Sequence, residues 1–187
     1  EQQIGYIIYL NGDNSYLEMS GYQTGIDYLK AYNLVPKFGA FILINETAFT
    51  NFPLFAINRL DYTHLDKIMS HPIVLGKIDN HNQNKVFSLE NFKIKNWIRS
   101  NLILFNKEIF ASILDYSLVN YTLEKCFHNE NLIINMSPKL KRKISKWLSK
   151  DRYSHLSKEK YKLKVISILN EYRLSQHLLT FCDLSSL

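Results

Sequence analysis

The sequence predicts an α+β protein, in which a small antiparallel β-barrel or meander precedes an α-helical C-terminal half. Two observations support this class. In the first 60 residues, apolar runs of strand length alternate with turn residues, and from Asp61 onward apolar residues recur at helical spacing. Strands and helices that are segregated along a chain are typical of α+β folds. We therefore expect a β-rich part over residues 1–72 and a helical part over residues 73–187.

The β-rich part begins with residues 4–10, which are β-branched and aromatic and are followed by turn residues at 11–14 (NGDN). Further strands are expected at residues 38–45 (FGAFILIN) and 52–58 (FPLFAIN). Residues 25–32 are compatible with a helical turn as well as with a strand, and the pattern leaves this open.

A first helix is expected at the end of the β-rich part, in the segment DYTHLDKIMSHP, residues 61–72. Asp61 is a suitable N-cap and Pro72 ends the helix, while Leu65, Ile68 and Met69 share one helix face. Longer helices are expected over residues 89–104, 107–127, 139–150 and 158–169, with a short one over residues 174–181.

Composition indicates a globular protein of a reducing compartment. With 187 residues, of which 46% are hydrophobic, the chain can bury a core without disulfides or a metal. Cys126 and Cys182 lie far apart without CxxC spacing, which is typical of unpaired, buried thiols, so a cytoplasmic location is expected. No apolar run approaches the ~18 residues of a membrane span, so none is expected.

Several short motifs in residues 4–72 occur in the order found in a known sensory barrel. They are GYIIYLNGD, SYLEMSG, the pair Phe38-Gly39 and LFAINRLDYTHLDKIMSHP. In shortened form they resemble the cyclic-nucleotide-binding-type β-barrel of CRP/FNR-like transcription regulators, whose last strand passes into a helix ending at His-Pro. The resemblance implies a sensor domain that binds an effector or mediates dimerisation. An ordinary β-meander, with Gly-Asp as a simple turn, is the alternative.

Cyclic-nucleotide binding is not part of this expectation. The region after Gly39 lacks the Gly-Glu and Pro-x-Arg-Ser/Thr-Ala cassette of that family. A buried phosphate needs an Arg and a cluster of backbone N–H groups, yet the stretch FGAFILINETAFTNFPLF contains no basic residue. The expected ligand of this part is therefore an apolar small molecule, or none.

Positive charge is concentrated in one block. Residues 137–164 contain 11 Lys and Arg against 2 Asp and Glu, a net charge of +9, whereas the whole chain carries +6. Ser137 and Pro138 are a favourable N-cap and first-turn pair. The helix that they begin has an apolar face and a basic remainder, and the apolar face consists of Leu140, Ile144, Trp147 and Leu148.

A second basic helix is expected after Ser157, with Lys158, Lys160, Lys162 and Lys164 in its first turns. Lys and Arg on two neighbouring helices are typical of surfaces that bind phosphate backbones. The segment MSPKLKRK also resembles the base-reading helix of AraC-type helix-turn-helix regulators. The residues expected to contact nucleic acid are Lys139, Lys141, Arg142, Lys143, Lys146, Lys150 and Arg152.

The sequence thus favours a DNA-binding transcription regulator. An interaction or scaffold protein, whose basic helices dock on an acidic protein or a membrane surface, is the alternative, and a solvated face without a partner is a third interpretation. A homodimer is expected, since the helices predicted over residues 89–104 and 107–127 are long and apolar enough to bury more than one face.

Enzymatic chemistry is not expected, and neither is a cofactor or metal. The sequence contains no GxSxG, GxxxxGK[ST], GxGxxG or HExxH motif. Asp61, His64 and His71 can share a helix face, but a carboxylate with imidazoles on an exposed helix is common. Cys126 lies beside His128 only in sequence, and a catalytic dyad requires contact in space.

Overall fold

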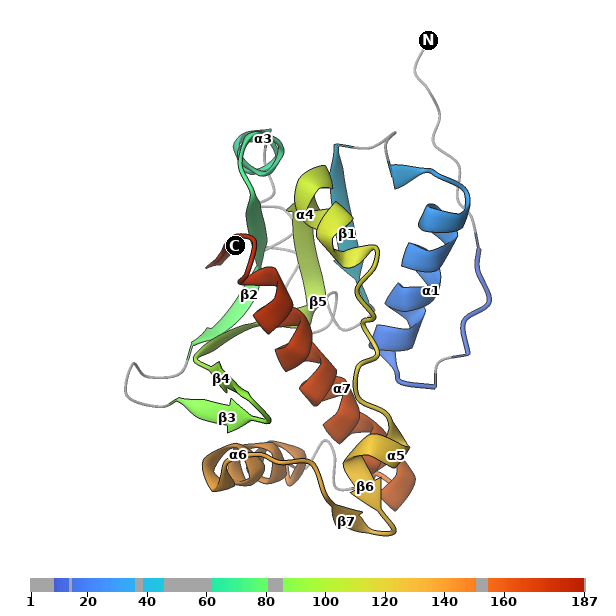
Figure 1. Ribbon diagram of the computed structural model, residues 1–187, viewed down its shortest axis with the longest axis vertical. Coiled ribbons are helices and arrows are strands. Elements are labelled where there is room, and N and C mark those ends of the chain that lie inside the picture. The colour runs from blue at the N-terminus through green and yellow to red at the C-terminus, as the bar shows by residue number, and fades with distance from the viewer. Residues whose placement is uncertain are drawn as a thin grey trace.

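The computed structural model describes residues 9–13, 15–35, 39–45, 62–80, 86–150 and 155–186. Its centre is an open four-stranded sheet with the strand order β1-β5-β2-β8 (Figure 1). Strand β5 (Asn96–Asn106) is antiparallel to β1 (Ala40–Ile44) and to β2 (Ile73–Asn80), and β8 (Asp183–Ser186) is parallel to β2. Two separate hairpins are formed by β3 (Phe87–Leu89) with β4 (Phe92–Ile94) and by β6 (Phe127–His128) with β7 (Asn131–Leu132).

Helices cover both faces of the sheet. On one face, α1 (Glu18–Ala31), α4 (Lys107–Ile113) and the C-terminal half of α7 (Lys158–Leu178) pack in one apolar cluster with β1, β2 and β5. On the other face, Ile68 of α3 (Tyr62–Ser70) packs against Leu75 and Leu104. Strand β5 is therefore enclosed between helices, and its residues 102–106 are all buried.

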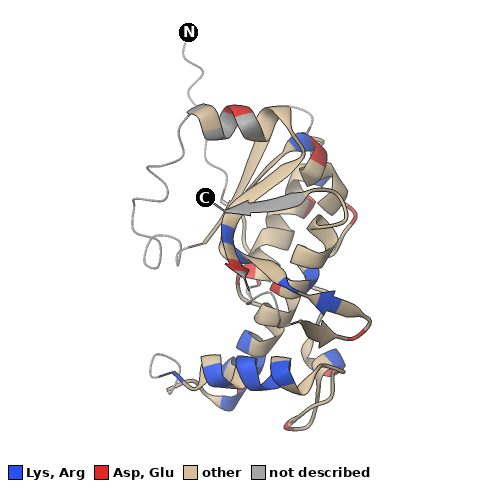
Figure 2. Ribbon diagram, turned by 90° about the vertical axis from the view of Figure 1, so that its left-hand side faces the viewer, with Lys and Arg blue, Asp and Glu red and all other residues tan. Residues whose placement is uncertain are grey.

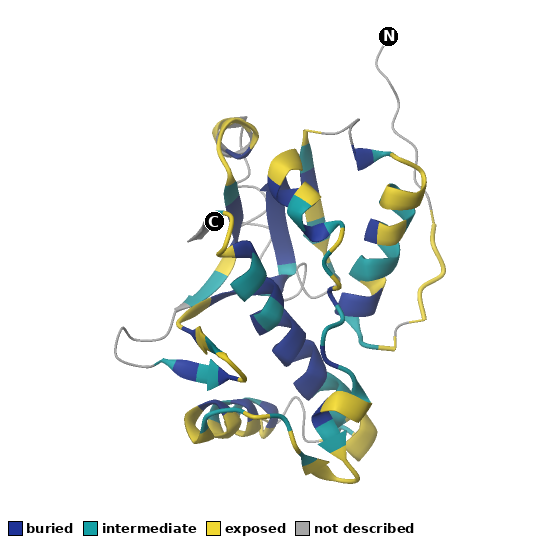
Figure 3. Cartoon of the chain, in the orientation of Figure 1, coloured by how far each residue is buried: buried dark blue, intermediate teal, exposed yellow. Residues whose placement is uncertain are grey.

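Helix α7 is shared by two apolar clusters, which is why it is buried nearly all round (Figure 3). Its C-terminal half lies on the sheet, through Leu174 and Leu178. Its N-terminal half, through Ile166 and Leu169, belongs to a second cluster with hairpin β3–β4, α5 (Leu123–Cys126) and α6 (Pro138–Leu148). The helix thus connects the sheet to the part of the molecule that carries α6.

Gly76 permits the close approach of β2 to β5. A Cβ at this position would lie 2.6 Å from the Leu102 carbonyl oxygen and 2.6 Å from Ile98 Cδ1. The register of the two strands shifts between Gly76 and Ile78. A residue without a side chain is required where two backbones come this close.

The α+β class is confirmed, and so are the strand within residues 38–45 and the helix within residues 61–72. The helices expected over residues 139–150 and 158–169 are also confirmed, although the second continues to Leu178 and includes part of the expected short helix over residues 174–181. The expected strands at residues 4–10 and 52–58 fall mainly or wholly outside the described residues.

The helix expected over residues 89–104 is wrong, because this segment ends β3 and forms β4 and most of β5. Helices cover both faces of β5, so its run from Leu102 to Phe105 is apolar at every position. Such a run is common to buried strands and buried helices, and periodicity does not separate them.

The single helix expected over residues 107–127 is wrong in its middle. Helix α4 ends at Ile113, and α5 begins only after Thr122. Between them, the backbone N–H groups of Asn120 and Tyr121 donate to Asn170 Oδ1. Asn170 belongs to α7, so a tertiary contact supplies the hydrogen bonds of these two N–H groups. The local sequence does not predict this non-helical segment.

The N-terminal region also differs from a barrel. SYLEMSG, compared above with a barrel strand, contains the start of α1, in which Met19 and Ile26 are buried on the side that meets the sheet. The described strands form open sheets and no closed barrel. Strand β1, from the expected β-rich part, pairs along its length with β5 of the expected helical part. A domain boundary at residue 72 remains a prediction.

Candidate functional site

Helix α6 is held at both its start and its inner face. The Ser137 hydroxyl accepts a hydrogen bond from the Leu140 N–H at 3.4 Å, and Pro138 occupies the first turn. The same hydroxyl accepts from the Ser88 N–H at 3.1 Å, while the Ser137 N–H donates to the Ser88 carbonyl oxygen at 2.9 Å. Ser137 therefore caps α6 and also fixes it to strand β3.

The inner face of α6 consists of Leu140, Ile144 and Leu148, which are all buried in the second apolar cluster. The helix contains five Lys and Arg and no Asp or Glu, and these cations lie on its other faces. Figure 2 shows them gathered along the helix at the lower end of the molecule. The expected amphipathic basic helix is thus confirmed, except that Trp147 is only half-buried.

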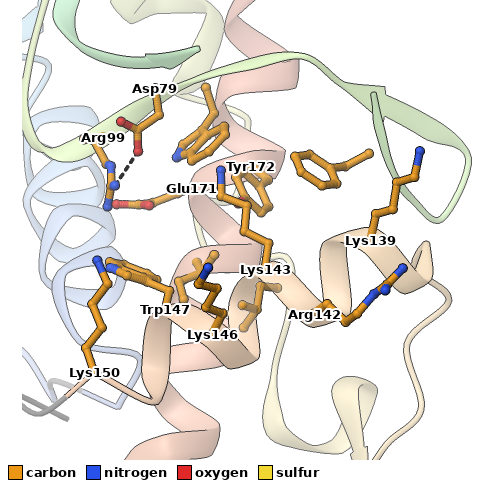
Figure 4. A pocket seen from close by; sticks show the side chains of 14 residues that line it. Asp79, Arg99, Lys139, Arg142, Lys143, Lys146, Trp147, Lys150, Glu171 and Tyr172 are labelled. Carbon is orange, nitrogen blue, oxygen red and sulfur yellow. Dashed lines mark ion pairs between the residues drawn. The ribbon is translucent and has the colours of Figure 1, made fainter. Parts of the chain in front are cut away.

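A half-open cleft of about 900 Å³ lies between α6, strands β2, β3 and β5, and α7 (Figure 4). Its lining is basic and aromatic, with six Lys and Arg against Asp79 and Glu171. The cations are Arg99, Lys139, Arg142, Lys143, Lys146 and Lys150, and the aromatic rings are Phe87, Trp97, Trp147 and Tyr172.

Cations and rings alternate on the inner wall of this cleft. The Arg99 guanidinium lies 4.9 Å from the centre of the Trp147 ring and 6.0 Å from that of Trp97, and it forms an ion pair with Asp79. The Lys143 ammonium lies 3.9 Å from the centre of the Trp97 ring. Cation–π attraction of this kind holds the long side chains in place.

Glu171, the second acidic residue of the cleft lining, is buried. Its Oε1 accepts from the Ser100 N–H at 2.9 Å and contacts the Ser100 hydroxyl, whereas its Oε2 has no hydrogen-bond partner in the described structure. Burial raises the pKa of Glu171, and the nearby Glu18 carboxylate raises it further, while Arg99 acts in the opposite direction. The folded protein therefore keeps the Glu171 proton to a higher pH than the unfolded chain does.

Glu18 is the second carboxyl group in contact with Ser100. Its Oε1 accepts from the Ser100 hydroxyl at 3.0 Å, from the Ser167 hydroxyl at 2.9 Å and from the Lys164 ammonium at 3.4 Å. Burial favours a higher pKa for Glu18, but the Lys164 charge and these hydrogen bonds lower it overall. The Ser100 hydroxyl has one hydrogen, which it can donate to the ionised Glu18 carboxylate. Its oxygen can accept a hydrogen bond from a protonated Glu171 carboxyl group, so both contacts are satisfied when Glu18 is ionised and Glu171 keeps its proton.

Five of the seven residues expected to contact nucleic acid line the cleft, namely Lys139, Arg142, Lys143, Lys146 and Lys150. Lys141 is exposed on α6 but does not line the cleft, and Arg152 is outside the described residues. On α7, Lys162 pairs with Glu130 and Lys164 with Glu18, so these two lysines of the second basic helix have acidic partners within the protein.

Sequence reasoning missed Arg99 and Glu171. Each is a charged residue inside a largely apolar stretch, WIRSNLILF for Arg99 and VISILNEYRL for Glu171. A charged residue in such a stretch is the sequence signal that could have identified them. Cys126 is a buried core thiol, as expected, and burial raises its pKa to about 12. Asp61 is outside the described residues. Among the described residues, no three His, Cys, Asp or Glu side chains are grouped so that they could hold a metal ion.

None of the helices in the described part of the chain is both long and apolar enough to cross a membrane. The chain matches no protein-family model, and comparisons with curated proteins and with solved structures gave no significant similarity.

Proposed function

We propose that this protein binds DNA through the basic surface of helix α6. One observation carries the proposal. An 11-residue helix, anchored by three buried apolar side chains, presents five Lys and Arg and no acidic residue. Phosphate backbones are bound by such surfaces, because each neutralised phosphate releases condensed counterions.

Three lysines of α6 lack an acidic partner among the described residues, and this supports the proposal. Within the described residues, Lys139, Lys141 and Lys146 form no ion pair, whereas Lys162 and Lys164 of α7 do. Lysines that pair with carboxylates inside the protein stabilise the fold, and lysines that do not are available to a ligand. The basic surface of α6 therefore has the character of a contact surface.

A more specific proposal is that this DNA-binding protein is a transcription regulator that acts as a homodimer. Its N-terminal part would be the effector or dimerisation domain. It rests on the resemblance to CRP/FNR-like regulators. The long helix expected over residues 89–104, which was one argument for the dimer, is replaced by strands. Light scattering at micromolar concentration tests the dimer directly, and a species of 22.0 kDa alone would reject it.

The proposal is tested by the salt dependence of binding to a fluorescein-labelled duplex oligonucleotide, measured by anisotropy. The logarithm of the affinity should fall linearly with the logarithm of the salt concentration. Replacing both Lys141 and Arg142 by Ala should weaken all duplex sequences alike and reduce the salt slope by about two. The control is Lys107→Ala, because Lys107 is exposed on α4 at the opposite end of the molecule (Figure 1).

Two results contradict the proposal. One is the absence of DNA binding at low salt, which would favour the alternative of an acidic protein partner. The other is an unchanged salt slope in the double variant, since the charges of α6 would then be solvated rather than engaged.

A further inference from the structure

We infer that the cleft beneath α6 receives a single unpaired nucleotide, so that this protein binds DNA containing unpaired bases more tightly than fully paired duplex DNA. This inference rests on the proposed function and adds the state of the DNA that is recognised. It is carried by the chemistry of the cleft lining and by two buried polar atoms without partners.

The first argument is the distribution of charge and apolar surface in the cleft. Lys139, Arg142 and Lys146 lie along α6, and the half-buried ring of Trp147 belongs to the same helix (Figure 4). The buried rings of Trp97 and Tyr172 also line the cleft. A nucleotide has the same two parts, an anionic phosphate and a planar aromatic base. Proteins that bind single strands combine a positive groove along the backbone with aromatic surfaces that contact the bases.

The second argument is a pair of unsatisfied polar atoms in two residues of the lining. Arg99 Nε carries a hydrogen to donate, and Glu171 Oε2 can accept, yet neither has a hydrogen-bond partner in the described structure. Buried polar groups are almost always paired, so two exceptions in one cleft point to a ligand. Every nucleobase has donor and acceptor atoms on its edge, and this edge would supply both missing partners once the side chains that bury the two atoms turn aside.

The size and accessibility of the cleft fit this ligand. At about 900 Å³ it is as large as typical ligand pockets, and it is partly open to solvent. A base inside a duplex is stacked and paired and cannot enter. An unpaired base costs little to extrude, which makes the cleft selective for interrupted or single-stranded DNA.

The test compares two probes, a duplex oligonucleotide and the same duplex carrying an internal loop of unpaired thymidines. We expect the looped probe to bind about 10-fold more tightly. Both tryptophans of the chain line the cleft, so the looped probe should also quench the tryptophan emission more strongly than the duplex does. Free nucleoside monophosphates, titrated as unlabelled competitors, should remove the preference before they remove duplex binding.

Two variants distinguish binding in the cleft from binding elsewhere on α6. Trp147→Leu removes a ring of the cleft but keeps an apolar side chain against the helix, and it should abolish the preference for the looped probe while duplex binding persists. The matched control is Lys141→Ala on the same helix, which should weaken both probes equally because Lys141 does not line the cleft. Thermal unfolding of each variant shows whether it is folded.

The outcomes distinguish the two proposals. Equal binding of both probes by the wild-type protein, with no effect of mononucleotides, overturns this inference and leaves the proposed function standing. Failure to bind either probe overturns both. The comparison of the two probes with the wild-type protein tests the inference even if Trp147→Leu does not fold.

Discussion

Replacement of Gly76 by Ala should destabilise the central sheet strongly. The new Cβ would lie 2.6 Å from the Leu102 carbonyl oxygen, and 2.6 Å and 2.9 Å from the Ile98 Cδ1 and Cγ1 atoms. Relief of the contact with Ile98 requires a side chain in a packed core to move, which costs about 1–3 kcal/mol. Relief of the contact with Leu102 requires the β5 backbone to move, which strains ladder hydrogen bonds worth about 1 kcal/mol each. We therefore expect the free energy of unfolding to fall by about 2–4 kcal/mol.

The matched control is the same substitution in an open position. Gly21 lies within α1, and a Cβ there would meet nothing within 4 Å. Its φ angle is not positive, so Gly21→Ala should raise stability by about 0.5–1 kcal/mol. Urea unfolding followed by far-UV circular dichroism measures both variants. A loss smaller than about 1 kcal/mol for Gly76→Ala would refute the close packing of β2 on β5.

Three further predictions concern the site and the core. Ser137→Ala should lower the free energy of unfolding by about 1–2 kcal/mol in urea titrations, because Ser137 caps α6 and also accepts from the Ser88 N–H; a neutral effect would show that the cap is dispensable. The pKa of Glu171 is higher in the folded protein than in the unfolded chain. Its contribution to the free energy of unfolding is therefore fully present below the unfolded-chain pKa of about 4.5, and it is lost as the pH rises through the folded-state pKa. Glu171→Gln should therefore flatten the decline of stability with rising pH, and an unchanged pH profile of the melting temperature would contradict it. Cys126 is fully buried and its pKa is raised to about 12, so a thiol reagent at neutral pH should label Cys182 first and Cys126 only after unfolding; equal labelling rates in the native protein would count against this core.

Local sequence was sufficient for α6 and for its charge. The Ser-Pro pair, the spacing of Leu140, Ile144 and Leu148, and the absence of acidic residues all lie within one short segment. Helix caps and helical periodicity depend on neighbours three or four residues apart, so they are readable without the fold. The five predicted contact residues that line the cleft belong to this same block.

The cleft itself depends on pairings that are distant in sequence. Arg99 comes from β5 and Glu171 from α7, and the Ser100 N–H that orients Glu171 is 71 residues away from it. The same dependence explains why the apolar run ending β5 resembled a helix, since only the helices packed on both faces of the sheet make a continuous apolar strand favourable. The sequence by itself determined the basic amphipathic helix and the α+β class, because these follow from short-range spacing and composition. The tertiary structure decided which side chains face α6 across the cleft, because β5 and α7 meet only when the core is buried.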